Sequence, residues 1–259
     1  MEHQFITYEI NEGISTIYLN RPPFNPLNKQ LFYELNSLLG ELENNSEVKV
    51  IIITGAGDRA FCAGADVKEF QTLNHQEVLE MCEISHDTLF KIENVGKPVI
   101  AAINGLALGG GSEVALACDF RICTERSKFG FPEINLGLIP GAGGTQRLQR
   151  LIGQAKAKEM VFCGEVIDAQ QALSVGLVNK VVPVDSLEEE VRSFAKKLAE
   201  KPQVAMRWLK KSVNNGADVD LQTAAKLEIS YFANVFASED CKEGMQAFAD
   251  KRTPVFTGR

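Results

Sequence analysis

The sequence VIAAINGLALGGGSEVALACDFRICT, residues 99–124, contains two apolar runs separated by a glycine-rich turn and a short helical pattern. The runs Val99–Ile103 and Phe120–Thr124 predict strands that are buried on both faces, because they lack polar alternation. A helix is predicted to begin near Ser112, after three consecutive glycines. Strand, glycine-rich turn, helix and strand in this order indicate an α/β fold with repeated units.

The preceding part of the chain repeats this alternation of strands and helices. FITYEI (5–10) and ISTIYLN (14–20) flank Asn11-Glu12-Gly13 and predict a hairpin, with glycine at a turn position. A helix is expected from Lys29, since five leucines recur there at helical spacing: Leu31, Leu35, Leu38, Leu39 and Leu42. VKVIIIT (48–54) predicts a buried strand, followed by a glycine-rich loop, and 76–93 predicts a long helix.

Beyond about Val184 the strand patterns end and only helical patterns remain. Four helices are expected, over residues 187–200, 204–215, 221–237 and 240–250. We therefore expect an α/β core over residues 1–195 and an all-helical region over 196–259. Such a tail has little room for a core of its own and is expected to pack on the α/β core or on another subunit.

Composition excludes several classes of protein. The net charge of −7 makes nonspecific binding to nucleic acid or to anionic membranes unfavourable. No apolar run approaches the roughly 20 residues that a membrane span needs, and the first residues lack a signal-peptide pattern. The six cysteines contain no CxxC pair and predict reduced thiols, hence a soluble, cytoplasmic protein: Cys62, Cys82, Cys118, Cys123, Cys163 and Cys241.

Three loops hold more glycine than packing requires: residues 61–66, 109–111 and 140–145. Small residues let a ligand approach the backbone, and the first turn of a helix has N–H groups without an intrahelical partner. Two such loops beside neighbouring strands can direct two N–H donors at one oxygen, which is an oxyanion hole. The alternative is that the glycines only permit tight turns. Neither a GxGxxG motif nor a phosphate-binding loop is present.

Two carboxylates lie in apolar surroundings. Glu113 follows the glycine triplet in a helix of small apolar residues, and Glu133 lies between Pro132 and Ile134. Burial raises a carboxyl pKa and lets two acids act as proton donor and acceptor. The alternative is a structural salt bridge with Arg121 or Arg147, and the residues alone favour neither interpretation.

AFCAGAD (60–66), INGLALGGGSEVALACD (103–119) and FGFPEINLGLIPGAGGTQRL (129–148) resemble the crotonase (enoyl-CoA hydratase/isomerase) superfamily. The C-terminal SEDCKEGMQAFADKR is similar to the same family, and the resemblance extends from about residue 5 to 252. It implies a spiral of repeated ββα units and a C-terminal helical region that builds trimers or dimers of trimers. The substrates it implies are acyl-CoA thioesters.

The resemblance also assigns roles to single residues. It implies an oxyanion hole made by the amides of Ala65 and Gly110. The acyl-CoA would bind along residues 63–68 and near the two later loops: Ala63, Gly64, Ala65, Asp66, Val67, Lys68, Gly110 and Gly141. The Gly141 N–H would help to hold the reacting water. Phe24-Asn25-Pro26 departs from the family pattern close to this site.

Glu113 and Glu133 are separated by 20 positions and match the two acids of the hydratases. The resemblance therefore implies addition of water to a trans-2-enoyl-CoA, giving a 3-hydroxyacyl-CoA, with both glutamates as catalytic residues. Neither a metal nor a redox cofactor is expected. Alternatives are a hydratase of branched or dicarboxylic enoyl-CoA and a Δ3,Δ2-enoyl-CoA isomerase. An RNA-binding role and a catalytically silent scaffold are disfavoured by the acidic charge and by the two retained acids.

Overall fold

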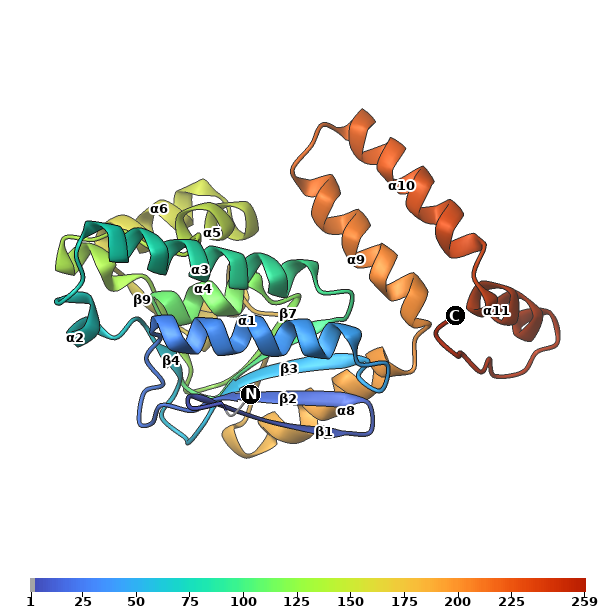
Figure 1. Ribbon diagram of the computed structural model, residues 1–259, viewed down its shortest axis with the longest axis horizontal. Helices are drawn as coiled ribbons and strands as arrows, with labels where there is room; N and C mark the ends of the chain where they lie inside the picture. The colour runs from blue at the N-terminus through green and yellow to red at the C-terminus, as the bar shows by residue number, and fades with distance from the viewer. Residues whose placement is uncertain (1–2) are drawn as a thin grey trace.

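The chain begins with an antiparallel hairpin of β1 (Ile6–Asn11) and β2 (Ile14–Leu19) in the computed structural model, which describes residues 3–259 (Figure 1). Two residues, Glu12 and Gly13, form its turn, and both have positive φ, of 51° and 79°. That geometry matches the twist of the flanking strands. The hairpin predicted around Asn11-Glu12-Gly13 is confirmed.

The hairpin is the edge of a six-stranded sheet. Its other strands are β3 (Val50–Gly55), β5 (Val99–Ile103), β7 (Phe120–Thr124) and β10 (Lys180–Val182), and the order is β1-β2-β3-β5-β7-β10. Every pair from β2 onward is parallel. Parallel strands require crossover connections, so helices must cover the faces of this sheet.

A second sheet was not predicted. It contains β4 (Ala60–Ala63), β6 (Leu106–Leu108), β8 (Lys128–Gly130) and β9 (Val166–Asp168). Two of its strands, β4 and β6, lie in segments that we expected to be glycine-rich loops. Strands β4, β6 and β8 follow β3, β5 and β7 along the chain, and β4–β6 and β6–β8 are parallel. Each repeat therefore contributes one strand to each sheet, which produces the predicted α/β spiral.

Helices cover both faces of the larger sheet (Figure 1). One face packs against α1 (Lys29–Asn44), α3 (His75–Asn94) and α4 (Gly110–Ala117), whose apolar side chains share the larger core cluster with the strands. The other face packs against α8 (Leu187–Ala199). The leucine stripe of α1 is wholly buried in this core, as its spacing predicts.

Shorter elements surround the smaller sheet. They are α2 (Val67–Phe70), η1 (Pro132–Leu136), α5 (Gly144–Ile152), α6 (Gln154–Cys163), α7 (Ala169–Ser174) and η2 (Val184–Ser186). Glycines end or begin several of them with positive φ, including Gly137, Gly143 and Gly164. These glycines permit the sharp changes of direction that bring η1 and α5 back over α4.

The C-terminal region consists of α9 (Gln203–Ala217), α10 (Leu221–Phe236) and α11 (Glu239–Ala249). Helices α9 and α10 form an antiparallel hairpin that projects from the α/β core, and α11 lies at its end (Figure 1). Together with α8 these are the four predicted helices, with ends that differ by one or two residues.

Buried Lys210 anchors α9 to the core. Its Nζ donates to the carbonyl oxygen of Ile92 at 2.9 Å and to Oδ2 of Asp119 at 2.7 Å. Asn214, one turn further along α9, donates to the carbonyl oxygen of Glu93 at 2.8 Å. The hairpin is thus fixed to the end of α3, whereas α10 contacts mainly α9.

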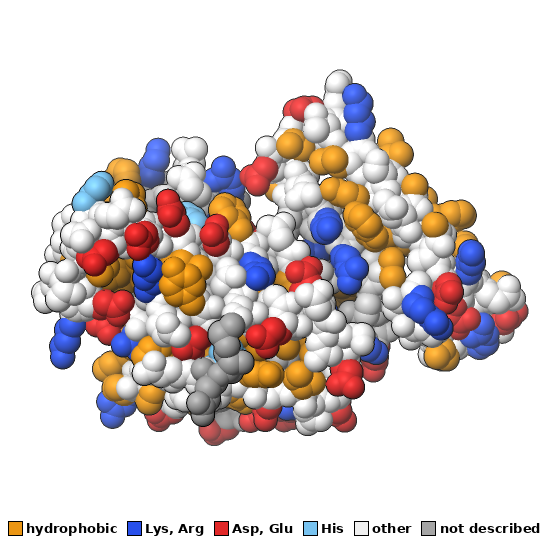
Figure 2. Space-filling view, in the orientation of Figure 1, with side chains coloured by type: hydrophobic (Ala, Val, Ile, Leu, Met, Phe, Trp, Pro, Cys, Tyr) orange, Lys and Arg blue, Asp and Glu red, His pale blue; other side chains and the backbone are white. Residues whose placement is uncertain are grey.

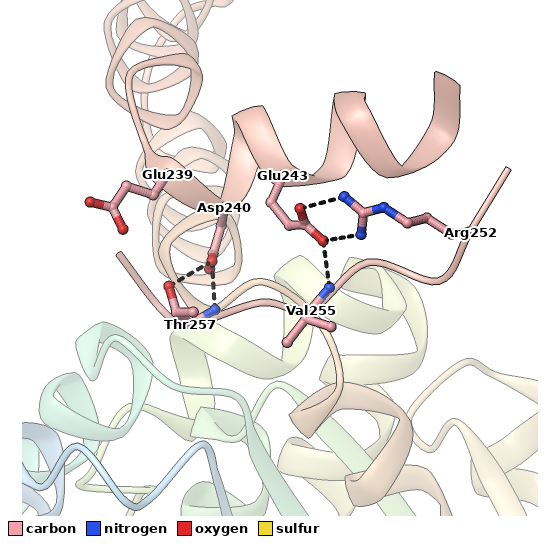
Figure 3. Close-up of a pocket in the computed structure, with 6 residues that line it drawn as sticks. All are labelled: Glu239, Asp240, Glu243, Arg252, Val255 and Thr257. Atoms are coloured by element: carbon pink, nitrogen blue, oxygen red, sulfur yellow. Dashed lines mark hydrogen bonds and ion pairs between the residues drawn. The ribbon is translucent and has the colours of Figure 1, made fainter. Parts of the chain in front are cut away.

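The final residues fold back on α11 and enclose a hollow lined by Glu239, Asp240 and Glu243 (Figure 3). Glu243 accepts hydrogen bonds from Arg252 at 2.7 and 2.8 Å, and from the amide of Val255 at 2.8 Å. Asp240 accepts from the amides of Thr257 and Gly258 at 2.7 and 2.9 Å. Asp240 and Glu243 therefore both hold the C-terminal residues against α11.

The expected division at residues 195 and 196 falls inside α8. The buried side of this helix extends to Ala199, which packs against the larger sheet with Leu187, Val191 and Ala195. The division into 1–195 and 196–259 stays a prediction, and the structure places the last of these core contacts at Ala199. Among residues 3–259 no helix combines the length and apolarity needed to span a membrane.

Candidate active site

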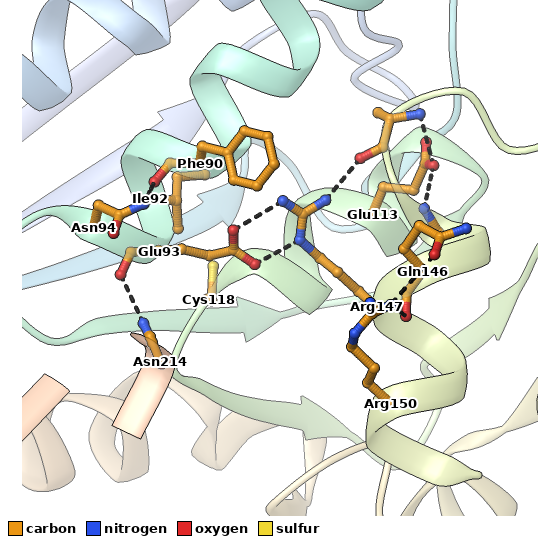
Figure 4. A network of polar contacts seen from close by, with 12 residues as sticks. Phe90, Ile92, Glu93, Asn94, Glu113, Cys118, Gln146, Arg147, Arg150 and Asn214 are labelled. Atoms are coloured by element: carbon orange, nitrogen blue, oxygen red, sulfur yellow. Dashed lines mark hydrogen bonds and ion pairs between the residues drawn. The ribbon is translucent and has the colours of Figure 1, made fainter. Parts of the chain in front are cut away.

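Glu113 lies in the first turn of α4 and is 2% exposed. Its Oε1 accepts two hydrogen bonds from the loop before α5, from the amides of Ala142 at 2.8 Å and Gly144 at 2.7 Å (Figure 4). Within residues 3–259 its Oε2 accepts no hydrogen bond. The carboxyl group is thus held by one oxygen and leaves the other available.

Glu133 lies in the first turn of η1, and its Oε1 lies beside Gly109, the first residue of the glycine triplet. A Cβ on Gly109 would lie 2.7 Å from its Oε1, and Gly109 has a φ of +52°. Glycine is therefore required at position 109 both by the backbone conformation and by the approach of the carboxylate. Oε2 of Glu133 is buried and has no partner among the described residues.

The two carboxyl groups converge at Gly109 and Gly110. A Cβ on Gly110 would lie 3.9 Å from Oε2 of Glu113, while Oε1 of Glu133 borders the preceding glycine. The charge of Glu133 also contributes to raising the pKa of Glu113. Each acid has an oxygen with no hydrogen-bond partner among residues 3–259, so the pair can bind one small polar ligand between them.

Burial shifts the protonation of both acids. It raises the pKa of Glu113 from 4.5 to about 7, against the two amide hydrogen bonds, which act in the opposite direction. Burial also raises the pKa of Glu133. A carboxyl group that titrates near neutral pH can both give and take a proton, as general acid–base catalysis requires.

The alternative of a structural salt bridge is wrong for both acids. Arg147 pairs with Glu93, at 2.6 Å between Nε and Oε1. Arg121 donates instead to carbonyl oxygens, including those of Leu177 at 2.8 Å and Cys118 at 2.7 Å. No ion pair among residues 3–259 involves either Glu113 or Glu133.

The backbone amides of Ala65 and Gly110 lie in neighbouring loops. Residues 64–66 pair with Leu27, whose amide donates to Gly64 at 2.8 Å and whose carbonyl accepts from Asp66 at 2.8 Å. Leu27 also borders Gly110, since a Cβ there would lie 2.9 Å from its Cδ1. No hydrogen bond within residues 3–259 uses the N–H of Ala65 or Gly110.

The residues that precede these two amides, Gly64 and Gly109, also lie close together. A Cβ on Gly109 would lie 3.7 Å from Cα of Gly64. The two uncommitted amides therefore follow two glycines that lie against one another. This arrangement brings close together the two donors that we expected from the resemblance.

The other residues expected to bind acyl-CoA have varied environments. Asp66 caps α2, accepts from the amides of Lys68 and Glu69, and pairs with Arg21 at 2.8 Å. The Arg21 guanidinium lowers the pKa of Asp66. The side chains of Val67 and Lys68 are exposed, and Gly141 is exposed beside Cys82, whose Sγ would lie 3.7 Å from a Cβ on that glycine.

Ala63 borders a hollow of about 680 Å³ formed by the N-terminal segment that departs from the family pattern. Phe24 and Pro26 line this hollow, together with Arg21. Asn25 is buried beneath it and donates to the carbonyl oxygens of Ala56 at 3.0 Å and Ala60 at 2.9 Å. The segment thus presents Phe24 at the surface beside the expected acyl-CoA site.

Sequence patterns did not identify the groups that hold these residues in place. The amides of Ala142 and Gly144 were missed because the backbone offers the same donor at every position. Leu27 was missed because it belongs to an ordinary apolar pattern. The excess of glycine at residues 140–145 was the available signal, and it indicated only that this loop approaches something closely.

Comparisons with known protein families, sequences and structures all match enoyl-CoA hydratases. The family model described as Enoyl-CoA hydratase/isomerase matches residues 9–259. A protein of Syntrophomonas wolfei named crotonyl-CoA hydratase is 42% identical over 260 residues, covering 100% of both chains. A short-chain-enoyl-CoA hydratase of Clostridium acetobutylicum is 41% identical over 253 residues, covering 97% of each.

A solved structure agrees over the whole chain. The crystal structure of an enoyl-CoA hydratase from Bacillus anthracis superimposes with a TM-score of 0.95 at 44% identity, covering 99% of this chain and 100% of the other. The chain therefore belongs to the enoyl-CoA hydratase/isomerase family. The predicted family, fold class and enzyme class, an enoyl-CoA hydratase, are confirmed.

Proposed function

We propose that this chain adds water to a trans-2-enoyl-CoA thioester, with Glu113 and Glu133 acting on one water molecule. The observation that carries the proposal is the convergence of two buried carboxyl groups at Gly109 and Gly110, each with an oxygen that accepts no hydrogen bond from residues 3–259. The family relationship supports the substrate class.

The thioester oxygen binds between the amides of Ala65 and Gly110. Hydrogen bonds to this oxygen draw electrons from the conjugated double bond, so that the β-carbon becomes electrophilic and the enolate that forms is stabilised. The uncommitted state of both N–H groups supports this role. No metal or redox cofactor is required, because the two amides supply the electrophilic assistance.

The water lies between Glu113 and Glu133. One carboxylate removes a proton as the water oxygen bonds to the β-carbon, and the other acid delivers a proton to the α-carbon. The product is a 3-hydroxyacyl-CoA, and water supplies its new hydroxyl oxygen. The pKa of Glu113, raised to about 7, and the raised pKa of Glu133 support this exchange of protons.

The acyl-CoA extends from the oxyanion hole along residues 63–68, and Phe24 lies beside its course. The N–H of Gly141 assists in holding the water, next to the two amides that hold Glu113. Relatives named crotonyl-CoA and short-chain-enoyl-CoA hydratase favour a short acyl chain.

The test combines crotonyl-CoA with water enriched in ¹⁸O. Loss of the conjugated thioester absorbance, together with one ¹⁸O atom in 3-hydroxybutyryl-CoA by mass spectrometry, is the expected result. Parallel reactions with trans-3-hexenoyl-CoA and with branched or dicarboxylic enoyl-CoA measure the alternative activities. Conversion of the 3-enoyl substrate without hydration of any 2-enoyl thioester would replace the proposal by an isomerase.

We also propose that the chain functions as a homo-oligomer, a trimer or a dimer of trimers, in the cytoplasm. Hydrophobic side chains follow the projecting α9–α10 hairpin (Figure 2), and those of Leu209, Ile229 and Phe232 are exposed by 60–69% in the single chain. An exposed apolar surface of this kind favours association. Sedimentation of the wild type as a trimer or hexamer, and of Phe232→Asp as smaller species, is expected.

A further inference from the structure

The loop that holds Glu113 has little conformational restraint of its own. It runs from Pro140 to Gly144 and contains three glycines, of which Gly143 has a φ of +98°. Glycine gives a chain more freedom than any other residue, so such a loop needs contacts from elsewhere to keep one conformation. The position of Oε1 of Glu113 depends on that conformation, because both of its donors belong to this loop.

Arg147 supplies a contact that fixes the loop. Its Nη1 donates to the carbonyl oxygen of Ala142 at 2.9 Å, and the amide of Ala142 donates to Oε1 of Glu113 (Figure 4). The guanidinium also occupies the space that a side chain at position 143 would fill. Ala142 therefore connects the two side chains, because its carbonyl oxygen accepts from Arg147 and its amide donates to Glu113.

Glu93 in turn holds the guanidinium in place. Its two carboxylate oxygens accept from Nε of Arg147 at 2.6 Å and from Nη2 at 2.9 Å, a bidentate geometry (Figure 4). The Arg147 side chain is 12% exposed, and its Cζ lies 5.2 Å from the centroid of the Phe90 ring. Partial burial and two parallel hydrogen bonds make this pair more directional than an exposed ion pair.

The end of α3 that carries Glu93 is itself fixed to the C-terminal hairpin. The carbonyl oxygen of Glu93 accepts from Nδ2 of Asn214 at 2.8 Å. The contacts therefore run from α9 through Glu93 and Arg147 to the loop before α5, and end at the carboxyl group on α4.

From this geometry we infer that Arg147, held by Glu93, is a positioning residue that fixes the loop donors of Glu113. The inference rests on the proposed function, in which Glu113 is a catalytic residue. Arg147 pairs with Glu93 and touches the Ala142 carbonyl, and its role is exerted through that loop.

The charge of Arg147 adds a signature that a purely structural contact would lack. Ionisable groups on the elements around Glu113 interact with its charge, among them Cys62 of β4, Cys82 of α3, Glu133 of η1 and Arg147 of α5. Of these, Arg147 is the cation, and it lowers the pKa of Glu113 against the larger effect of burial. Its removal is therefore expected to raise that pKa further.

The test compares Arg147→Gln, Arg147→Lys and Glu93→Gln with a matched control, Arg150→Gln. Arg150 lies on the same helix, but its side chain is 58% exposed. It donates to the carbonyl oxygen of Gln146 at 3.0 Å and pairs with exposed Asp218 at 3.6 Å, and no hydrogen bond among residues 3–259 joins it to the loop that holds Glu113. Arg147→Gln is expected to lower kcat for crotonyl-CoA by on the order of 10-fold to 10²-fold, with KM changed about two-fold at most, because a misplaced catalytic group affects the transition state most. Glu93→Gln is expected to lower kcat by a smaller factor, and the control to match the wild type.

An infrared titration of the Glu113 carboxyl group, assigned by its absence in Glu113→Gln, is the second measurement. The midpoint is expected to rise in Arg147→Gln and to return toward the wild-type value in Arg147→Lys, which restores the positive charge. Thermal unfolding of each variant shows whether it is folded at the assay temperature.

An unchanged kcat in folded Arg147→Gln would overturn the inference. A fall in kcat that only follows the folded fraction, with an unmoved midpoint, would also overturn it. Failure of the proposed function has a different outcome, in which wild type and Glu113→Gln consume enoyl thioesters at the same rate. The infrared midpoints still decide the inference in that case.

Discussion

The amide nitrogen of Gly144 lies 2.7 Å from Oε1 of Glu113, although the two residues are separated by 31 positions in the chain. This contact joins the first turn of α5 to the first turn of α4. Helix N-termini present N–H groups without intrahelical partners, so the beginning of α5 is suited to hold a carboxylate. The free oxygen of Glu113 is thereby turned toward the glycine triplet.

Replacement of Gly144 by alanine is expected to displace Glu113. The added Cβ would lie 3.0 Å from Oε1 of Glu113 and 2.8 Å from Cε1 of buried Phe131, so one of them must move. Hydratase kcat should fall by on the order of 10²-fold, the effect of misplacing a catalytic group. Gly216→Ala is the matched control, because its Cβ would make an ordinary contact of 3.5 Å with Ala224. Equal rates for Gly144→Ala and wild type would contradict this role of the contact.

Stability should depend on pH through Glu113. Its pKa is about 7 in the folded chain and 4.5 ordinarily, so the folded state binds the proton more tightly. The contribution of this group to stability is thus present below pH 4.5 and is lost as the pH rises toward 7. Glu113→Gln should remove that loss. The free energy of unfolding of the variant, minus that of the wild type, should therefore be about 1–3 kcal/mol larger at pH 8 than at pH 5.

Urea unfolding at one fixed protein concentration measures this difference, with Glu189→Gln as an exposed control. If Glu113→Gln and wild type show parallel stability from pH 5 to pH 8, the carboxyl group is not held at a raised pKa.

Removal of the Lys210 ammonium group should destabilise the attachment of the C-terminal hairpin. Lys210→Met leaves Asp119 without the cation that lies 2.7 Å away, and both side chains are largely buried. Breaking a buried ion pair from one side costs about 3–5 kcal/mol. Chemical denaturation measures the loss, and Lys226→Met on α10, where the side chain is exposed, is expected to be neutral. A neutral Lys210→Met would show that the hairpin is attached by other contacts.

The long elements could be predicted from sequence because their patterns are local. The leucine stripe of α1 and the apolar runs of β3, β5 and β7 each contain their own periodicity, and the structure places them within a few residues of the expected bounds. The strands of the smaller sheet contain only three or four residues each. Segments so short have no measurable period, and two of them, β4 and β6, lie within stretches that the sequence indicated as glycine-rich loops.

The two acids of the site could be predicted from the sequence, whereas the residues that hold them in position could not. Glu113 and Glu133 are conspicuous because burying a charged residue in an apolar segment costs free energy unless the residue is paired or functional. The partner of Arg147 could not be predicted, since Glu93 is 54 residues away and each charge has many candidate partners. Only the packing of α3 against α4 and α5 selects this pair.

The most direct test of two acids acting on one water is the rate of crotonyl-CoA hydration by Glu113→Gln, Glu133→Gln and the double variant. Each single substitution should lower kcat by roughly 10² to 10⁴, the contribution of a general acid or base. The double variant should lose much less than the product of the two single losses, because the acids work as a unit. Near wild-type turnover by either single variant would contradict the account.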